Sequence, residues 1–371
     1  MKTKTIIIKV GTQSILSQTG MIRDGVLPSI VKQIAELQKT GAHLVLVSSG
    51  AVGSGRRVSR ELFGREYGNS IAEKQLLASL GQHELLHTYS TLFKKYDILS
   101  AQLLLTKQDF HTRQHYLNIA RLLREVLDHK NIIPIINEND SVAIEELMFT
   151  DNDELAGLIA AQLGADKLII LTSVKGVYDG HPDDPNSKII PIINPEEKHH
   201  QVSAIKTAHG RGGMVSKLST AQKMSTLGIC THIAHIDEPD VIVRIANGEP
   251  LGTTILPVKK KSSKKRWIAF SCSKNNGRIQ INPCLEQIIE RKEKITSILP
   301  VGIEKCTGEF EKGDLVDIIG QNGNKIGVGI AKYGSNKLHP LLGLKNKPVF
   351  IHYDHLYIDT KPIKPIQTKA S

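Results

Sequence analysis

Two hydrophobic patterns alternate along the first 257 residues, and this alternation limits the fold more than any other feature of the chain. Short apolar runs rich in β-branched residues are typical of buried strands, and segments with helical spacing lie between them. Such alternation predicts a mostly parallel α/β sheet between two helix layers. We expect strands at 5–10, 44–48, 100–105, 132–136, 167–171 and 231–234. We expect helices at 26–39, 73–95, 114–129, 155–163 and 215–226.

The distribution of charge divides the chain into two domains. Residues 1–257 hold 27 Lys/Arg and 27 Asp/Glu, so the whole net charge of +11 lies in residues 258–371. A cationic, serine-containing stretch stands at the join, as a linker would. We therefore predict a first domain at 1–257, a linker at 258–266, a basic second domain at 267–360 and a tail at 361–371.

Several classes of protein are disfavoured by what the sequence lacks. It holds no apolar stretch of the roughly 18 residues that a membrane span needs. Its four cysteines show no CxxC spacing, and no HExxH is present, so neither a disulfide scaffold nor a protein-built metal site is predicted. Walker A, GxGxxG and GxSxG motifs are also absent. The simplest expectation is a cytoplasmic protein without a membrane partner.

Two dense polar clusters follow the apolar run at 132–136. The first is Asn137-Glu138-Asn139-Asp140, and the second is Asp151-Asn152-Asp153. Ligands of open α/β sheets bind outside the carboxyl ends of the strands, where the first cluster falls. Carboxylates and carboxamides together suit a zwitterion, which needs both acceptors and donors. Asp153 alone would fit a helix N-cap in a solvated loop, but the two clusters together favour a ligand site.

Two glycine-containing segments offer backbone N–H groups to an anion. Residues 48–55 form a turn of small residues that can lead into a helix, where backbone N–H groups would bind a phosphate or a carboxylate. The alternative is that the glycines only permit a tight turn. Residues 210–217 combine flexible glycines with a lysine one turn into a helix, as in a loop that covers phosphate. The alternative is an exposed linker with a surface lysine. Lys9 closes the first predicted strand.

Taken together, these segments resemble the amino-acid kinase family, and the second domain is similar to a PUA domain. The kinase-like segments are 9–12, 48–51, 137–142, 151–153, 171–172, 175–178, 212–214 and Lys217, in the order that the family shows. In the PUA-like domain, Trp267-Ile268 resembles the opening, 299–303 and 308–314 the central strands, and 351–354 the closing strand of a small β-barrel-like fold.

The resemblance is closest to family members that transfer phosphate from ATP to the side-chain carboxylate of L-glutamate, the first step of proline biosynthesis. It implies Lys9, Lys217 and Asp153 as catalytic residues. It implies Ser49, Gly50, Asn137, Asp140, Asp151 and Asn152 as substrate-binding residues. For ATP it implies Lys9, Thr172, Ser173, Arg211, Gly212, Gly213, Met214, Val215, Ser216 and Lys217. Mg²⁺ would be held largely by ATP oxygens.

Two residues depart from the family pattern. Ser173 stands where the family usually has Asp, and Arg211 stands where Thr is common. Both positions concern ATP binding rather than the reaction, and a guanidinium near phosphates can neutralise charge.

The resemblance also implies partners and leaves alternatives open. L-Proline would be a feedback inhibitor, the chain would form a homo-oligomer, and glutamyl phosphate reductase would be a partner. The basic second domain leaves RNA binding open. Alternative readings are another kinase of the same fold, acting on aspartate, N-acetylglutamate, carbamate or UMP, or an RNA-binding protein that acts through its second domain.

Overall fold

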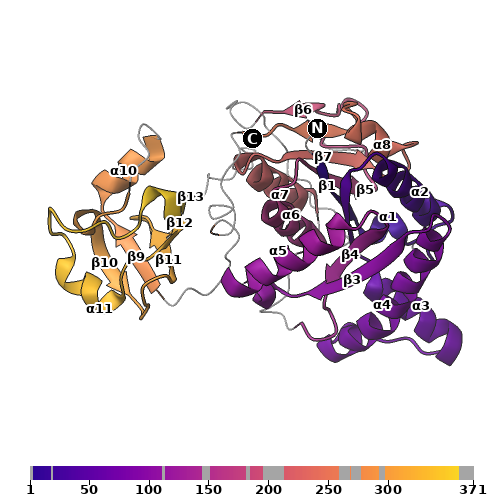
Figure 1. The fold of residues 1–371 in the computed structure, drawn as a ribbon, viewed down its shortest axis with the longest axis horizontal. Helices are drawn as coiled ribbons and strands as arrows, with labels where there is room; N and C mark the ends of the chain where they lie inside the picture. The colour runs from indigo at the N-terminus through magenta and orange to yellow at the C-terminus, as the bar shows by residue number, and fades with distance from the viewer. Residues whose placement is uncertain are drawn as a thin grey trace. The chain divides into compact units, whose positions relative to one another are not determined.

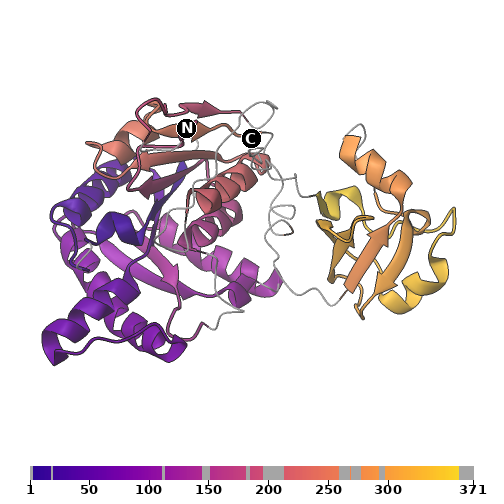
Figure 2. The same ribbon diagram turned by 180° about the vertical axis from the view of Figure 1, so that it is seen from behind.

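The computed structural model describes residues 3–17, 20–110, 113–143, 151–180, 184–194, 213–258, 268, 277–291 and 297–358. Contacts divide the chain into two compact units between Lys260 and Lys261, each with its own sheet (Figures 1 and 2). Within the described ranges, no helix combines the length and apolar composition that crossing a membrane requires.

The first unit is built on an eight-stranded sheet with the order β3-β4-β2-β1-β5-β7-β8-β6. The strands are β1 (Thr5–Val10), β2 (His43–Ser48), β3 (Leu99–Leu105), β4 (Ile132–Glu138), β5 (Lys167–Thr172), β6 (Ile192–Ile193), β7 (Cys230–His235) and β8 (Thr253–Ile255). Every neighbouring pair is parallel except β7–β8. The central strands are buried along nearly their whole length, which explains their continuous apolar runs.

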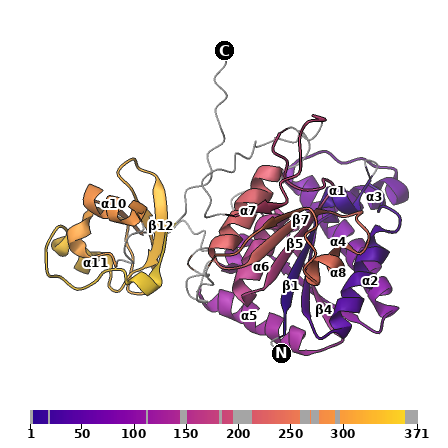
Figure 3. The same ribbon diagram turned by 90° about the horizontal axis from the view of Figure 1, so that it is seen from above.

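Helices cover both faces of this sheet (Figure 3). One layer contains α5 (Arg113–Asp128), α6 (Asn152–Leu163) and α7 (Met214–Thr226). The other contains α1 (Thr12–Ile15), α2 (Val26–Lys39), α4 (Ile71–Lys94) and α8 (Val241–Ala246), with α3 (Ala51–Phe63) packed along α4. A short 3₁₀ helix, η1 (Lys107–Phe110), precedes α5. The predicted α/β class, a mostly parallel sheet between two helix layers, is confirmed.

All predicted strands and helices of this unit are present, with ends shifted by at most three residues. The helix expected from residue 73 begins at Ile71, because Ser70 and Glu73 form a reciprocal capping box. The short elements α8, β6 and β8 were not predicted, since their apolar runs are short. Past the end of β5, Tyr178 forms an antiparallel bridge with Ile189.

Helix α3 forms despite its early glycines because it lies unusually close to α4. A Cβ atom on Gly55 would lie 1.9 Å from the carbonyl oxygen of Leu77, and one on Gly81 would lie 1.8 Å from that of Ala51. Only glycine permits this approach. The contact places the start of α3, and with it the carboxyl end of β2, beside the middle of α4.

The second unit holds a five-stranded sheet with the order β10-β9-β11-β12-β13. Its strands are β9 (Gly277–Ile281), β10 (Ile303–Thr307), β11 (Leu315–Ile319), β12 (Lys325–Ile330) and β13 (Leu356–Ile358). Its helices are α10 (Pro283–Arg291), α11 (Ser335–Leu338), η2 (Pro300–Gly302), η3 (His339–Leu341) and η4 (Tyr353–His355). Apolar side chains, among them Ile279, Val316, Ile318 and Phe350, form a core separate from that of the first unit.

Several strand assignments in the second unit are wrong. Most of 299–303 is the 3₁₀ helix η2, and β10 begins only at Ile303. Residues 308–314 form the turn between β10 and β11, where Gly308 and Gly313 adopt φ of 82° and 99°. The segment 351–354 gives one bridge, from Ile351 to Ile298, before η4; the closing strand is β13. Ile268 is fully buried, and Trp267 lies outside the described residues.

Candidate active site

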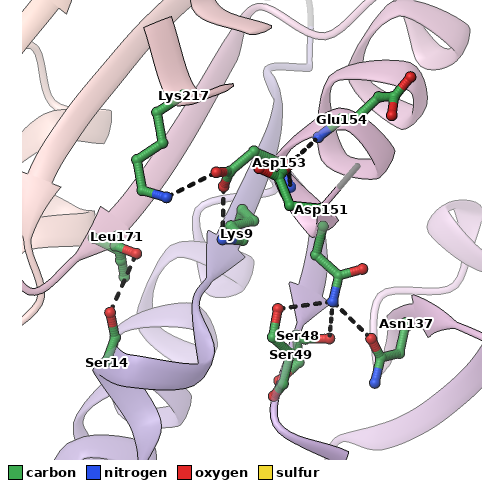
Figure 4. A network of polar contacts seen from close by, with 11 residues as sticks. Lys9, Ser14, Ser48, Ser49, Asn137, Asp151, Asp153, Glu154, Leu171 and Lys217 are labelled. Atoms are coloured by element: carbon green, nitrogen blue, oxygen red, sulfur yellow. Dashed lines mark hydrogen bonds and ion pairs between the residues drawn. The ribbon is translucent and has the colours of Figure 1, made fainter. Parts of the chain in front are cut away.

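Two ammonium groups from distant parts of the chain meet one buried carboxylate at the carboxyl ends of the central strands (Figure 4). Lys9 Nζ lies 2.6 Å from Asp153 Oδ1, and Lys217 Nζ lies 2.8 Å from Asp153 Oδ2. Asp153 is fully buried, while Lys9 and Lys217 are 4% and 7% exposed. The three predicted catalytic residues are therefore brought together, with one more positive than negative charge.

Three elements place these side chains. Lys9 is the last residue but one of β1, Asp153 lies in the first turn of α6, and Lys217 lies in the first turn of α7. A Cβ on Gly11 would lie 3.3 Å from Lys9 Nζ, so glycine at this position leaves room for the ammonium. The site thus depends on the packing of α6 and α7 against the end of β1.

The first turn of α6 is fixed by its own cap. Asp151 Oδ1 accepts hydrogen bonds from the backbone N–H groups of Asp153 (2.9 Å) and Glu154 (3.1 Å). The helix behind this cap is buried on nearly all sides. The positive end of the helix dipole also favours carboxylates in this turn. Asp151 is thus the N-cap that was considered for Asp153, and Asp153 is left to face the lysines.

The two carboxylates of this turn have opposite electrostatic environments. Burial alone would raise the pKa of Asp153, but the charges of Lys9 and Lys217 outweigh it and hold that pKa below its usual value. Burial, and next the negative charge of Asp153, raise the pKa of Asp151. Asp153 is therefore the permanent counter-charge of the two lysines.

A second group of predicted residues forms a hydrogen-bonded set of amides beside this ion cluster. Asn152 Nδ2 donates to Ser49 Oγ (2.7 Å) and to Asn137 Oδ1 (2.9 Å). Asn137, at the end of β4, is 2% exposed, and Ser49, just after β2, is 8% exposed. Gly50 follows with φ of 112° and precedes the first residue of α3, which has no side-chain cap. These residues join β2, β4 and α6 into one polar surface.

A cavity of about 290 Å³ opens next to this surface. Its polar lining includes Gln82, Glu138, Asn139, Asp140 and Ser141. Among the predicted substrate residues, Asp140 is the one that lines it. The amide cluster is joined to its wall by the hydrogen bond between Asn137 and Gln82. The cavity thus lies between α4 and the ends of β3 and β4, and its lining is rich in hydrogen-bond acceptors.

The predicted nucleotide residues lie along the ends of β5 and α7. Thr172, the last residue of β5, is buried, and Ser173 after it is exposed. Gly213 caps α7 without a side-chain hydrogen bond, so the backbone N–H groups of Met214, Val215 and Ser216 start a helix that favours anions. Arg211 and Gly212 lie outside the described residues. The neighbourhood of Lys217 therefore combines a helix N-terminus with a buried cation.

One residue of this surface was missed by the sequence reasoning. Gln82, in the middle of α4, accepts a hydrogen bond from Asn137 Nδ2 at 2.8 Å. A single glutamine inside a long helix gives no signal of its own. Its role depends on the close contact between α3 and α4 at Gly81, and the sequence does not show that contact.

No group of three or more His, Cys, Asp or Glu side chains within the described ranges could hold a metal ion. The donor set explains this at the ion cluster, because both oxygens of Asp153 are committed to ammonium groups. A divalent cation in this site would have to arrive with a ligand that carries most of its oxygens.

The chain matches known families over both units. Residues 4–235 match the amino acid kinase family, and residues 277–347 match the PUA domain. It is 41% identical to glutamate 5-kinase from Chlorobaculum tepidum, over 96% of this chain and 97% of that protein. It is 40% identical to glutamate 5-kinase from Bacteroides thetaiotaomicron, over 95% and 98% of the two chains. Among solved structures, UMP kinase from Bacillus anthracis gives a TM-score of 0.48 at 18% identity, over 69% of this chain and 97% of that chain.

Proposed function

The chain belongs to the amino acid kinase family, and from this premise we propose that it transfers the γ-phosphoryl group of ATP to the side-chain carboxylate of L-glutamate. The products are L-glutamyl 5-phosphate, the first intermediate of proline biosynthesis, and ADP. The observation that carries the proposal is the pair of buried lysines on Asp153. Relatives that match over nearly the full length and are named glutamate 5-kinase support the choice of acceptor.

The chemistry needs positive charge more than it needs a base. A glutamate side chain has an unperturbed pKa of about 4.3, so the nucleophile is already ionised at neutral pH. The task is to bring two anions together and to stabilise charge on the transferring phosphoryl group. Lys9 and Lys217 supply that charge, and Asp153 positions both ammonium groups before the substrates bind.

The amide surface is proposed to bind the amino acid. The carbonyl oxygen Oδ1 of Asn152 is buried and has no hydrogen-bond partner among the residues that the structure describes. An ammonium group of the substrate would satisfy it. Asp140 adds a carboxylate from the cavity. Ser49 Oγ accepts from Asn152, so its own proton is free to be donated to a substrate carboxylate near Gly50. Asn137 and Asp151 hold this surface in place.

ATP is proposed to lie across the ends of β5 and α7. The start of α7 would receive the phosphates, with Thr172 and Ser173 beside the nucleotide. The proposed set is Lys9, Thr172, Ser173, Arg211, Gly212, Gly213, Met214, Val215, Ser216 and Lys217. Mg²⁺ would be carried by ATP oxygens and would reduce the charge of the phosphates. Ser173 brings no negative charge to this position, unlike the Asp that the family usually has there.

A hydroxylamine trap tests the proposal. An acyl phosphate reacts with hydroxylamine to give a hydroxamate, so the coloured product reports which acid was phosphorylated. We expect ATP- and Mg²⁺-dependent hydroxamate with L-glutamate, and far less with L-aspartate or N-acetylglutamate. Equal or better turnover of either competitor would favour another kinase of the family, and no product with L-glutamate would refute the proposal.

Regulation and assembly are also part of the proposal. L-Proline shares the α-amino and α-carboxyl groups of glutamate, so a surface that binds those groups accepts it. It should therefore inhibit in competition with glutamate, and inhibition that is independent of glutamate concentration would contradict a shared site. We also propose that the chain forms a homo-oligomer and passes its unstable product to glutamyl phosphate reductase. We propose the cytoplasm as its location, where the three described cysteines would remain thiols.

RNA binding by the second unit is a second candidate function, favoured by one observation. The whole net charge of +11 lies in residues 258–371. Binding of a single-stranded RNA to the full chain should weaken steeply between about 50 and 200 mM salt, since neutralised phosphates release counterions. Failure to bind at the lower salt would leave assembly or regulation as the role of this unit.

A further inference from the structure

We propose that Gln82 is a positioning residue, which fixes the orientation of the Asn152 amide through Asn137. This inference rests on the proposed function, because the oriented group is the one proposed to receive the substrate ammonium. The residue lies on α4, outside every motif of the sequence, and reaches the site only because α4 lies close to the start of α3.

The orientation is set by one backbone group. The N–H of Glu138 donates to Asn137 Oδ1 at 2.9 Å. A backbone N–H can only donate, so the atom that faces it must be the carbonyl oxygen of the Asn137 side chain. The Nδ2 group of Asn137 then points to the opposite side, toward Gln82.

Gln82 completes this arrangement. Its Oε1 accepts from Asn137 Nδ2 at 2.8 Å. Asn137 is 2% exposed, so without this acceptor its Nδ2 group would be buried and unpaired. Gln82 thus removes the free-energy cost of burying an unpaired Nδ2 group. It thereby stabilises the orientation in which Asn137 Oδ1 can accept a hydrogen bond from Asn152.

That neighbour is Asn152. Asn152 Nδ2 faces three oxygen atoms: Asn137 Oδ1, Ser49 Oγ and, at 3.5 Å, the backbone carbonyl of Ser48. Because Asn137 Oδ1 and the Ser48 carbonyl can only accept, Asn152 must direct Nδ2 toward them. Oδ1 of Asn152 is left facing away, buried and without a partner among the described residues. The opposite orientation would point N–H groups at a substrate ammonium, which repels it. The oriented amide of Asn137, together with the Ser48 carbonyl, therefore fixes the orientation of Asn152.

The position of Gln82 follows from its neighbour in the sequence. Gly81 allows α4 to approach the Ala51 carbonyl so closely that any Cβ would lie 1.8 Å from it. At this distance the next side chain extends past the start of α3 to the end of β4. The small residues of α3 and α4 thus serve the site as well as the packing.

The experiment compares two substitutions of Gln82 in the full chain. Gln82→Met keeps the length but removes the acceptor, and Gln82→Glu keeps an acceptor oxygen. Gln82→Met should raise the glutamate KM about tenfold, in line with one lost hydrogen bond to a charged group. Its kcat and its KM for ATP should stay within about twofold of wild type. Gln82→Glu should keep the glutamate KM within about threefold.

A double substitution separates positioning from direct contact. If Gln82 acts through Asn152, Gln82→Met should add almost nothing to the glutamate KM of an Asn152→Ala protein. Gln75→Met is the matched control: Gln75 lies two turns earlier on α4 and donates to the Ala143 carbonyl at 3.3 Å, outside the amide set. It should leave the glutamate KM within about twofold of wild type.

Several results would overturn the inference. They are an unchanged glutamate KM in Gln82→Met, an equal loss in Gln82→Glu, or effects of Gln82→Met and Asn152→Ala that multiply. If circular dichroism shows Gln82→Met unfolded, Gln82→Ala takes its place in the same comparisons. A wild-type protein that phosphorylates no glutamate would refute the proposed function and this inference with it. An active wild type with an unaffected Gln82→Met would refute the inference alone.

Discussion

Lys217 Nζ donates a hydrogen bond of 2.8 Å to Asp153 Oδ2, across 64 positions of sequence, and both side chains are buried. Taking such charges out of water costs several kcal/mol per ion, and a buried ion pair is weak evidence of a stabilising role. A second ammonium, that of Lys9, shares the same carboxylate. The excess positive charge is unfavourable for the empty fold and suits an anionic ligand, which is why we assign the cluster to phosphoryl transfer.

Removing either lysine should slow the chemical step. Lys9→Ala and Lys217→Ala should each lower kcat by roughly 10²–10³, as for other preorganised electrostatic groups. Lys223→Ala, near the end of the same helix α7, is the control and should keep wild-type kcat. Steady-state kinetics with saturating ATP and glutamate measures this. A change in glutamate KM with kcat intact would contradict the assigned role.

Removing Asp153 should destabilise the fold as well as the active site. Asp153→Asn leaves two buried ammonium groups without a full counter-charge, and we expect a loss of about 3–5 kcal/mol at neutral pH. Urea unfolding measures it. Glu61→Gln, which removes a surface partner of Arg57, is the control and should cost less than about 1 kcal/mol.

The same residue predicts a dependence on pH. The pKa of Asp153 is lowered in the fold, so its stabilising contribution is complete above the unfolded carboxyl pKa of about 3.9 and is lost as pH falls through the folded pKa. The difference between wild type and Asp153→Asn should therefore shrink in strong acid. A constant difference at every pH would contradict the assignment of the charge.

Removing the amino-acid contacts should act on binding. Asn152→Ala and Asp140→Ala should raise the glutamate KM and change kcat little, because they remove contacts made equally in the ground and transition states. Initial rates over a range of glutamate concentrations decide this. A large fall in kcat at unchanged KM would reverse the division of roles between the amide surface and the lysines.

The buried side chain of His232 should make the folded state less stable in mild acid. Burial, and next the charge of Lys167, lower the pKa of His232 to about 4. An unfolded histidine takes up its proton near pH 6.5, so the fold is favoured above that pH and this contribution is lost as pH falls toward about 4. Between these limits, wild type should lose stability to urea faster than His232→Gln. Parallel curves would contradict the prediction.

Much of this structure could be predicted because the relevant signals are local. The strand and helix patterns of the first unit depend on burial on both faces of the sheet and on helical spacing, and both are written in consecutive residues. Local patterns placed Lys9 at the end of a predicted strand and Asp153 just before a predicted helix, and the resemblance gave both their catalytic roles. The resemblance supplied what local reasoning could not, namely that Lys217 from the far end of the domain joins them.

The errors and omissions have a common physical cause. Helix α3 carries glycines at positions 53 and 55 that disfavour a helix in isolation, and it is stabilised by packing on α4. The strands of the second unit are short, and their glycine turns were mistaken for strand sequence. Gln82 could not be found because its role depends on a contact between elements. Tertiary packing decides each of these cases.

The transfer of a labelled oxygen tests the central claim most directly. L-Glutamate carrying ¹⁸O in its side-chain carboxylate is incubated with the protein, ATP, Mg²⁺ and hydroxylamine, and the released phosphate is analysed by ³¹P NMR. If that carboxylate attacks the γ-phosphorus, its oxygen becomes the bridging atom of the acyl phosphate. Hydroxylamine then attacks the acyl carbon, and the phosphate leaves with the label. We predict phosphate that carries a single ¹⁸O atom, whereas unlabelled phosphate would show hydrolysis by water or another acceptor and would contradict the account.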